Sequence, residues 1–554
     1  MRLLFFGNLS TRNDNSYHQG MVSPEFDYVI VGAGSAGCVL ANRLSDCGRH
    51  RVLLLEAGPR DRYPWIHIPI GYAKTMFHPR YNWRYYTEPD ASMNKRRIYW
   101  PRGKVLGGSS AINGLIFIRG QQQDYDHWAA LGNVGWSWNE ILPYFIRMEN
   151  NERGASAWHG DAGPQAVSDI HSPSQLATAF IDASKQAGYL YNPDFNGVSQ
   201  EGVGYYQLIT NKGLRCSSAT AYLKPAINRA NLTVITNAFV NRIMFTDGRA
   251  DGVEYCFGHD RRCVSARREV ILSAGAVQSP HLLQLSGIGD AQLLGDHGLR
   301  VISNRSGVGQ NLQDHLQLRV IYRCNSKLTT NDDVKSVWRQ LRMASRYFLF
   351  RTGPLAIGVN QAGSFLKTSK DLPTPDIQFH FSALSSDLPG SSLHDFSGFT
   401  SSVCQLRPES RGRVALRSTN PKESPAIYPN YLTKELDQLT VISGLKIART
   451  IAMQPALARH IESEYLPGKD VHTNDELLDF AFRTGVTIFH PVGTCKMGND
   501  ANAVVDHRLR VWGVRGLRVV DCSVMPTLIS GNTHAPAVMI AEKGSDMILS
   551  DIER

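Results

Sequence analysis

The sequence has little of what would indicate disulfide bonds or a structural metal. Its 554 residues include only nine cysteines, and no two of them form a C-x-x-C pair. Cys256 and Cys263 are the closest pair, and their spacing matches no common zinc site. We therefore expect reduced thiols scattered through the protein and no bound metal.

Long apolar runs are missing as well. No stretch approaches the roughly 20 residues that span a bilayer. Segment 1–24 contains the apolar patch LLFF. This patch is shorter than the roughly 7–15 residues of a secretory signal core, and no small-residue cleavage site follows it. We expect residues 1–24 to form a disordered leader, with Met21 as an alternative start, and the protein to be cytoplasmic.

Charge is not concentrated in any one part of the chain. The formal net charge is +10, but the sequence contains no block of five or more basic residues and no nucleic-acid-binding motif. This argues against a nucleic-acid-binding protein and leaves contact with a membrane surface as an open alternative. The length predicts at least two domains, and the sequence shows neither internal repeats nor low-complexity segments.

What the sequence does contain is a nucleotide-binding motif in residues 26–58, FDYVIVGAGSAGCVLANRLSDCGRHRVLLLEAG. An apolar strand precedes Gly32-x-Gly34-x-x-Gly37, and a helical pattern follows it. The three glycines permit a tight turn, approach of the backbone to a pyrophosphate, and close packing of helix on strand. A second apolar strand ends at Glu56, where a carboxylate accepts hydrogen bonds from ribose hydroxyls. Together these features predict a dinucleotide site on a Rossmann-type α/β domain.

Three later stretches bear on which dinucleotide is bound. Residues 101–120, PRGKVLGGSSAINGLIFIRG, form a loop of small residues that can approach a flat ring. Residues 275–289, GAVQSPHLLQLSGIG, follow an apolar strand that we expect in the same sheet. In GLRVVDCSVMP, Asp521 ends a further strand, where its carboxylate suits a ribityl hydroxyl.

These motifs resemble those of the glucose–methanol–choline (GMC) flavoprotein oxidoreductases, from about residue 25 to the C-terminus. The bacterial choline, sorbose and alcohol dehydrogenases are the most similar branch. The resemblance implies FAD, bound by a Rossmann-type domain, and a discontinuous α+β substrate domain on a mostly antiparallel sheet. Some members attach FAD covalently through a histidine in the first signature loop. Residues 101–120 contain no histidine, so we expect non-covalent FAD.

The resemblance also assigns cofactor contacts to the glycine motif, the first signature loop, the aromatic stretch at 81–89 and the strand ends. The expected cofactor-binding residues are Gly32, Gly34, Ser35, Ala36, Gly37, Glu56, Ala57, Trp83, Val105, Gly108, Ser109, Asn113, Gly114, Val240, Asp521 and Thr533. For each aromatic side chain at 81–89, an ordinary core position is an equally good interpretation.

Oxidation of an alcohol needs a base that takes the hydroxyl proton as a hydride leaves the carbinol carbon, and histidine suits this role. His490 lies in TGVTIFHPVGTCKMG, where we expect an exposed turn. The resemblance identifies His490 as the active-site histidine and Asn532, in SGNTHAPAVMI, as its partner. We therefore expect His490 to be the base and flavin N5 the hydride acceptor. Asn532 would orient the substrate oxygen, and His534 would be structural or adjacent to the cofactor.

The chain leaves the nucleotide-binding fold and returns to it, so we expect discontinuous domains. We assign 25–159, 225–315 and 486–554 to the FAD-binding domain, and 160–224 and 316–485 to the substrate-binding domain. The cleft between the two domains is the expected substrate site.

Three elements are predicted within the substrate domain. DIQFHFSAL alternates as a strand, and SSVCQLRPESRGRVALRS is typical of a hairpin. The segment 329–354 predicts one amphipathic helix with Asn331 or Asp332 as its N-cap and Gly353-Pro354 as its stop. Its basic and aromatic face either packs on the protein's own core, which is the more common arrangement, or contacts a membrane or a partner subunit.

The expected function is FAD-dependent oxidation of a primary alcohol, or of a sugar or polyol hydroxyl, to the aldehyde or ketone. A dehydrogenase with a quinone-type acceptor is favoured over an oxidase that uses oxygen, and the positive net charge favours a neutral substrate. Alternatives within the family are an aryl or furfuryl alcohol oxidase and a choline dehydrogenase. Alternatives of another class are a hydroxynitrile-lyase-like flavoprotein, whose flavin stays oxidised, and a non-catalytic flavin-binding protein.

Overall fold

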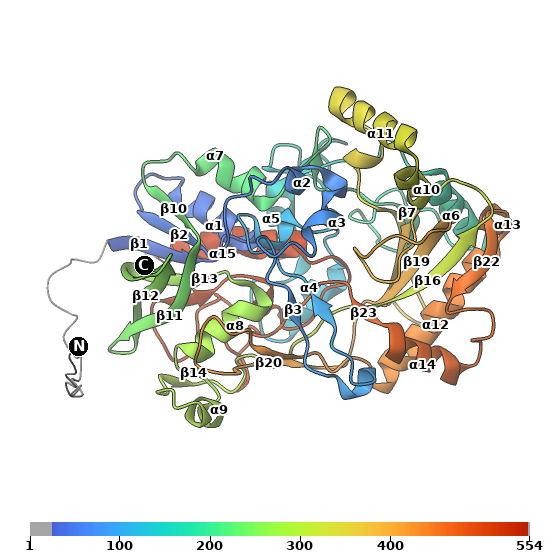
Figure 1. Cartoon of the computed structure of the whole chain (residues 1–554). Coiled ribbons are helices and arrows are strands. Elements are labelled where there is room, and N and C mark those ends of the chain that lie inside the picture. The colour runs from blue at the N-terminus through green and yellow to red at the C-terminus, as the bar shows by residue number, and fades with distance from the viewer. Residues whose placement is uncertain (1–24, 552–554) are drawn as a thin grey trace, which may run out of the picture.

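The computed structural model describes residues 25–551, so the leader expected in residues 1–24 lies outside the described residues. Two sheets of seven strands each organise this part of the chain. The first lies on the left of Figure 1 and the second on the right. This arrangement confirms the predicted α/β class with a second, sheet-based substrate region.

The first sheet has the parallel core that the nucleotide motif predicts. Strands β10, β2, β1, β13 and β24 pair in parallel in that order, and β12 and β11 extend β13 as antiparallel strands. Helix α1 connects β1 to β2 and packs against the C-terminal helix α15. These elements are β1 (Glu25–Val31), α1 (Ser35–Ser45), β2 (Val52–Glu56), β10 (Leu232–Thr236), β11 (Ala238–Thr246), β12 (Arg249–Phe257), β13 (Asp260–Leu272), β24 (Leu517–Val519) and α15 (His534–Ser550).

The second sheet is antiparallel at every pairing, in the order β22, β16, β19, β18, β17, β7, with β23 added to β16. Helices α6 and α12 pack on it. The predicted strand DIQFHFSAL is confirmed as β18. These elements are α6 (Gln175–Gln186), β7 (Gly202–Tyr205), β16 (Leu316–Cys324), β17 (Asn360–Leu366), β18 (Ile377–Ser382), β19 (Gly398–Gln405), α12 (Glu435–Ala452), β22 (Ile461–Leu466) and β23 (Val486–Thr487).

The exact domain boundaries remain our proposal. The first sheet draws its strands from the three segments assigned to the FAD-binding domain, and six strands of the second sheet come from the two substrate-domain segments. The exception is β23, which lies just after residue 485 but pairs with β16 of the second sheet.

The hairpin predicted for residues 401–418 is wrong. Strand β19 lies between β16 and β18, so both of its edges are already paired. The following strand, β20 (Arg413–Ala415), therefore pairs elsewhere, with β21 (Ala426–Tyr428).

The single helix predicted for residues 329–354 is two helices, α10 (Thr330–Lys335) and α11 (Val337–Phe350). Thr329 caps α10, in place of the predicted Asn331 or Asp332, and the hydroxyl of Ser336 caps α11 by accepting a hydrogen bond from the Arg339 N–H. A capping side chain inside the predicted helix thus restarts it. The expectation that α11 packs on the protein's own core is also wrong, because Tyr347 is its one buried side chain.

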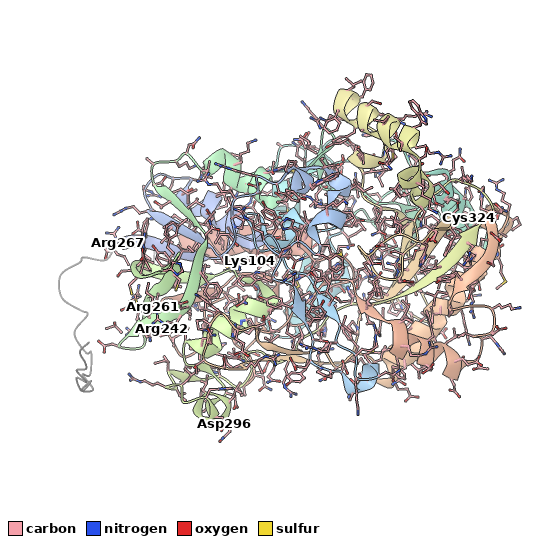
Figure 2. The ribbon with its side chains drawn as sticks, viewed as in Figure 1. Lys104, Arg242, Arg261, Arg267, Asp296 and Cys324 are labelled. Carbon is pink, nitrogen blue, oxygen red and sulfur yellow. The ribbon has the colours of Figure 1, made fainter. Side chains whose placement is uncertain are left out.

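The surface carries its positive charge in several places. Figure 2 shows Arg242, Arg261 and Arg267 extending from the edge of the first sheet formed by β11–β13, and Lys104 near the middle of the molecule. The Lys104 ammonium lies 4.5 Å from the centroid of the Trp83 ring, within range of a cation–π contact.

All nine cysteines are free, as predicted, and no group of His, Cys, Asp or Glu in residues 25–551 could hold a metal ion.

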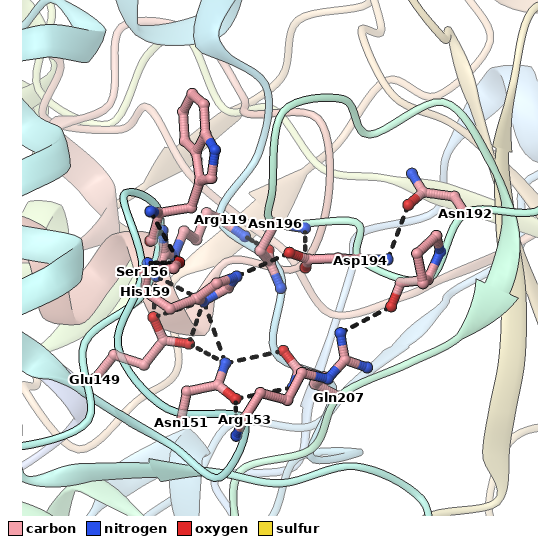
Figure 3. A network of polar contacts seen from close by, with 12 residues as sticks. Arg119, Glu149, Asn151, Arg153, Ser156, His159, Asn192, Asp194, Asn196 and Gln207 are labelled. Atoms are coloured by element: carbon pink, nitrogen blue, oxygen red, sulfur yellow. Dashed lines mark hydrogen bonds and ion pairs between the residues drawn. The ribbon is translucent and has the colours of Figure 1, made fainter.

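A buried network of charged groups joins the loop after α5 (Trp138–Met148) to the chain around residue 194 (Figure 3). His159 lies 3.0 Å from Glu149 Oε1 through Nδ1 and 2.8 Å from Asp194 Oδ2 through Nε2. The buried Arg119 guanidinium also pairs with Glu149. Burial alone would lower the pKa of His159, but hydrogen bonds to Asp194 and Glu149 and the charge of Glu149 outweigh it and raise the pKa to about 9. The protonated His159 ring, which is hydrogen-bonded through both nitrogens, therefore balances the charge of the second carboxylate, Asp194.

Replacing His159 by glutamine should remove a pH-dependent part of the stability. Because the folded-state pKa is raised, the stabilisation is fully present below the unfolded value of about 6.5 and is lost as pH rises through about 9. The shift corresponds to about 3 kcal/mol of unfolding free energy. Melting curves of both proteins between pH 6 and pH 9.5 should therefore converge at the alkaline end. A difference in melting temperature that stays constant with pH would contradict the raised pKa of His159. An equal effect in the exposed control His171→Gln would contradict it as well.

Candidate active site

One cavity lies at the carboxyl ends of β1, β2 and β13, and three helices begin at its wall. These are α1 after Gly34, α8 (Gly275–Leu285) after Ala274, and α15 after Thr533. The first turns of α1 and α15 have neither a capping side chain nor an acidic residue, whereas the first N–H of α8, that of Gly275, is bonded to the Asp521 carboxylate. Free N–H groups and the positive dipole ends of α1 and α15 therefore face the cavity, and they favour an anion such as a diphosphate.

The cavity brings together nearly all residues expected to bind the cofactor. Those that line it are Gly32, Gly34, Ser35, Ala36, Glu56, Ala57, Trp83, Gly108, Ser109, Asn113, Gly114, Val240, Asp521 and Thr533. Gly37 and Val105 do not line it. Gly37 lies where α1 packs on the end of β1, and Val105 is buried in a separate apolar cluster with Ile66. His534 also lines the cavity, and its Nδ1 lies 3.2 Å from the hydroxyl of Ser35.

The two carboxylates in the wall are held by backbone N–H groups. Glu56 accepts hydrogen bonds from Ala33 N–H at 2.9 Å and Gly58 N–H at 2.8 Å, and Asp521 accepts one from Gly275 N–H at 2.8 Å. Burial raises the pKa of Glu56 to about 7. Asp521 also accepts from the Ser279 hydroxyl at 2.6 Å through Oδ2 and from Ser523 N–H at 2.8 Å through Oδ1. A further lone pair for a ligand hydroxyl therefore remains on both oxygens of Glu56 and on Oδ1 of Asp521. The carboxylates thus fix the loops around the cavity and keep capacity to accept from a ribose or ribityl chain.

At the other end of the cavity, the pairing of β16 with β23 positions His490. Leu316 pairs with Thr487, so the residues that flank these two strands, His315 and His490, lie side by side. The backbone N–H of His490 donates to Asp314 Oδ1 at 2.7 Å. His490 is only 7 % exposed, so the expectation of an exposed turn is wrong. The second sheet covers this turn and leaves the side chain open to the cavity alone.

A chain of hydrogen bonds fixes which nitrogen of His490 is free. The Nε2 of His315 lies 2.9 Å from the carbonyl oxygen of Leu406, so this nitrogen carries the proton and donates. The Nδ1 of neutral His315 is then an acceptor, and it lies 2.9 Å from Nδ1 of His490. His490 therefore carries its proton on Nδ1. Its Nε2 is left with a lone pair, as a general base requires.

Asn532 faces that lone pair. Its Nδ2 donates to His490 Nε2 at 3.2 Å, and its Oδ1 accepts from Gln378 Nε2 at 3.2 Å. Gln378 also donates to the hydroxyl of Tyr206 at 3.1 Å. Because the Gln378 amide donates on one side, the Asn532 amide presents its own donor to the cavity. An acceptor nitrogen and a donor amide thus lie next to each other, an arrangement that can bind a hydroxyl group.

The surroundings keep these imidazoles neutral. Burial lowers the pKa of His490 well below its usual value, and His315, His380 and Arg102 lower it further. Burial also lowers the pKa of His315 to about 4. Both rings are therefore uncharged near neutral pH, and the free nitrogen of His490 is available without prior loss of a proton.

Comparison with known proteins identifies the family. Family models described as GMC oxidoreductase match residues 26–317 and residues 408–541, which together make up more than half of the chain. The chain belongs to the GMC oxidoreductase family. This confirms the resemblance drawn from the motifs. The protein is an FAD-dependent enzyme that acts on CH–OH groups, as predicted.

Individual GMC oxidoreductases resemble it over nearly their whole length. It is 43 % identical to an alcohol dehydrogenase [acceptor] of Pseudomonas putida, over 95 % of this chain and 96 % of the relative. It is 42 % identical to the mitochondrial choline dehydrogenase of Mus musculus, over 95 % and 89 %. The solved structure of pyridoxine 4-oxidase from Mesorbium loti superposes with a TM-score of 0.85 at 31 % identity, over 94 % and 98 % of the two chains.

The residues of this GMC oxidoreductase fit FAD. The uncapped helix N-termini at the cavity suit the diphosphate, and Glu56 and Asp521 have lone pairs for the ribose and ribityl hydroxyls. A Cβ added at Gly114, in the first signature loop, would meet nothing within 4 Å, so open space for a flat ring lies beside that loop. Loop 101–120 contains no histidine, and non-covalent FAD is the norm in the family.

Four residues around His490 were missed from the sequence: His315, Gln378, His380 and Arg102. His380 lines the cavity, and neither of its ring nitrogens has a hydrogen-bond partner among residues 25–551. Gln378 and His380 are two residues apart on β18 and therefore share a face. With Ser382 they make one face of β18 polar while the other face is apolar, and this was the signal that could have identified them.

Proposed function

We propose that His490 is the general base and Asn532 the positioning donor in the oxidation of a neutral primary alcohol. The observation that carries the proposal is the unprotonated Nε2 of His490, which accepts from the donor amide of Asn532 at 3.2 Å in the absence of substrate. A substrate hydroxyl placed between them would donate to the nitrogen and accept from the amide.

The chain's own residues supply proton handling and orientation. His490 takes the hydroxyl proton at Nε2 and keeps its Nδ1–H bonded to His315. Asn532 holds the substrate oxygen, and Gln378 holds Asn532. Bound FAD supplies the acceptor for the hydride from the carbinol carbon. Burial of the site keeps water away from the reacting groups.

The charges of the cavity support a neutral substrate. Glu56 and Asp521 are the two carboxylates that line it among residues 25–551, and each is held by backbone N–H groups near the expected nucleotide. Arg102 adds a positive charge to the wall. A quaternary ammonium would therefore find no free carboxylate beside His490, whereas a neutral alcohol needs none. This favours a neutral primary alcohol over the cationic alcohol choline, although choline dehydrogenases are among the relatives.

For the electron acceptor we propose a quinone-type molecule in preference to oxygen. The alcohol dehydrogenase of Pseudomonas putida is described as acting with an acceptor, and the Brucella suis relative as an oxygen-dependent choline dehydrogenase. The higher identity to the former supports the dehydrogenase.

Anaerobic mixing of the purified protein with single alcohols tests this function. We expect a neutral primary alcohol to bleach the absorbance of the oxidised flavin, and choline to bleach it at least roughly tenfold more slowly. Re-oxidation should then be slow in air and fast with a soluble quinone. If only choline or a sugar bleaches the flavin, that compound, and not a neutral primary alcohol, is the substrate. If no alcohol bleaches the flavin, a hydroxynitrile-lyase-like or a non-catalytic flavoprotein becomes the better interpretation of the function.

A further inference from the structure

Helix α11 projects from the molecule at the top right of Figure 1, and its side chains extend beyond the neighbouring surface in Figure 2. Trp338 is 82 % exposed, Phe348 64 % and Leu349 72 %. Large apolar side chains at such exposure keep a continuous apolar area in water, which a partner would remove.

These side chains share one face of the helix. At about 100° per residue, Trp338, Leu341, Phe348 and Leu349 fall within about a third of the circumference. Tyr347, the one buried side chain of α11, lies on the opposite side and attaches the helix to the protein through its hydroxyl, which donates to Gly213 O at 3.1 Å. The apolar face therefore points directly away from the body of the protein.

The face beside it is basic. Helix α11 contains three arginines and no acidic residue. Arg339 pairs with Asp333 at 3.3 Å. Arg342, Arg346 and the C-cap residue Arg351 form no ion pair with any residue between 25 and 551. Positive charge without local compensation, next to an exposed apolar strip that holds a tryptophan, complements the anionic headgroups and acyl chains of a lipid surface.

We propose that α11 docks the protein on a bilayer that contains anionic lipid, with the helix axis in the plane of the membrane. Fourteen residues make a helix about 21 Å long, shorter than the roughly 30 Å of a hydrocarbon core. Within residues 25–551 no helix has the length and apolar character to cross a membrane. The apolar strip enters the interface, Trp338 lies at the headgroup level, and the arginines contact the lipid phosphates.

The docking helix is also connected to the cavity wall. Asn331 of α10 donates through Nδ2 to Ser385 O and accepts from Ser385 N–H, and so anchors the loop that brings Pro389 to the cavity wall. After α11 in the chain, the N–H of Val359 donates to the hydroxyl of Tyr72, another wall residue, at 3.4 Å. The chain segments before and after the docking helix are thus both attached to the cavity wall. The docking itself does not depend on which alcohol or acceptor the enzyme uses.

Co-sedimentation of the FAD-loaded full chain with vesicles tests the proposal. The wild type should bind phosphatidylcholine vesicles that contain phosphatidylglycerol, and bind pure phosphatidylcholine vesicles at least tenfold more weakly. The double variant Trp338→Glu/Phe348→Glu should lose binding by at least tenfold, and Arg342→Glu/Arg346→Glu by roughly a hundredfold on the anionic vesicles. The matched controls are Leu190→Glu/Val198→Glu and Arg261→Glu/Arg262→Glu, which change exposed residues elsewhere.

Flavin absorbance and melting temperature check that each variant is folded. Equal loss of binding in the test and control variants would overturn the proposal. A wild type that does not co-sediment with anionic vesicles would also overturn it. Size-exclusion chromatography without lipid provides the remaining outcome. If the wild type is a dimer and Trp338→Glu/Phe348→Glu makes it a monomer, a second copy covers α11 and the membrane proposal is overturned.

Discussion

Replacing His490 by alanine should give a folded, yellow protein whose flavin is reduced by alcohol about 10²- to 10⁴-fold more slowly than in the wild type. The base is lost, whereas the helix N-termini that line the nucleotide end of the cavity are untouched. Stopped-flow loss of the oxidised-flavin absorbance under anaerobic conditions measures the rate directly. Added imidazole should restore part of it, because a small base can enter the space that the side chain leaves.

The Asn532→Ala variant separates the two roles. It keeps the base and removes the donor, so we expect a smaller loss, roughly tenfold to a hundredfold, with weaker substrate binding. Since burial lowers the pKa of His490 well below its usual value, the wild-type rate should also hold as pH falls through 6.5. If alcohol reduces the flavin of His490→Ala at a near-normal rate, another group is the base, and His380 or His534 would have to be tested.

The nucleotide end of this enzyme was predictable from its sequence because its geometry is local. In residues 26–58 a strand, a glycine turn and a helix follow one another, and the turn conformation depends on neighbours a few residues away. The carboxyl ends of parallel strands then meet at one edge, which brings Glu56 and Asp521 to the same cavity without further information. His490 and Asn532 were identified through the family motifs, and neither periodicity nor composition would have selected them.

The surroundings of His490 were not predictable in the same way. His315 contacts it across 175 positions of sequence, and this contact depends on the register of β16 with β23. Gln378 reaches Asn532 only because β18 lies under the cavity. The burial of His490 has the same cause, since the second sheet that covers it is assembled from distant segments. A pattern within one segment reports its amphipathic period and not which other segment covers it.

The second large effect is expected at Gly34. Its Gly34→Ala variant should fold normally as apoprotein and bind FAD at least a hundredfold more weakly, which is about 3 kcal/mol. An added Cβ there would have Ser273 O, at 3.9 Å, as its one protein neighbour within 4 Å, and the backbone is extended, with φ −79° and ψ −159°. The protein therefore tolerates the methyl group, but the methyl group occupies the approach of the diphosphate. Titration of the apoprotein with FAD and its melting temperature without FAD give the two readouts.

Two further glycines show why this separation of folding from cofactor binding is specific to Gly34. At Gly37 a Cβ would lie 1.8 Å from the carbonyl oxygen of Gly32, so Gly37→Ala must push α1 away from β1, and loss of the folded apoprotein is expected. At Gly295, in helix α9 (Ala291–Asp296), a Cβ meets nothing within 4 Å, so Gly295→Ala should leave FAD affinity unchanged and raise stability by up to about 1 kcal/mol. Wild-type affinity in Gly34→Ala would mean that the diphosphate does not approach this turn. An unfolded Gly34→Ala apoprotein would instead place the role of Gly34 in the packing of α1 on its strand, as at Gly37.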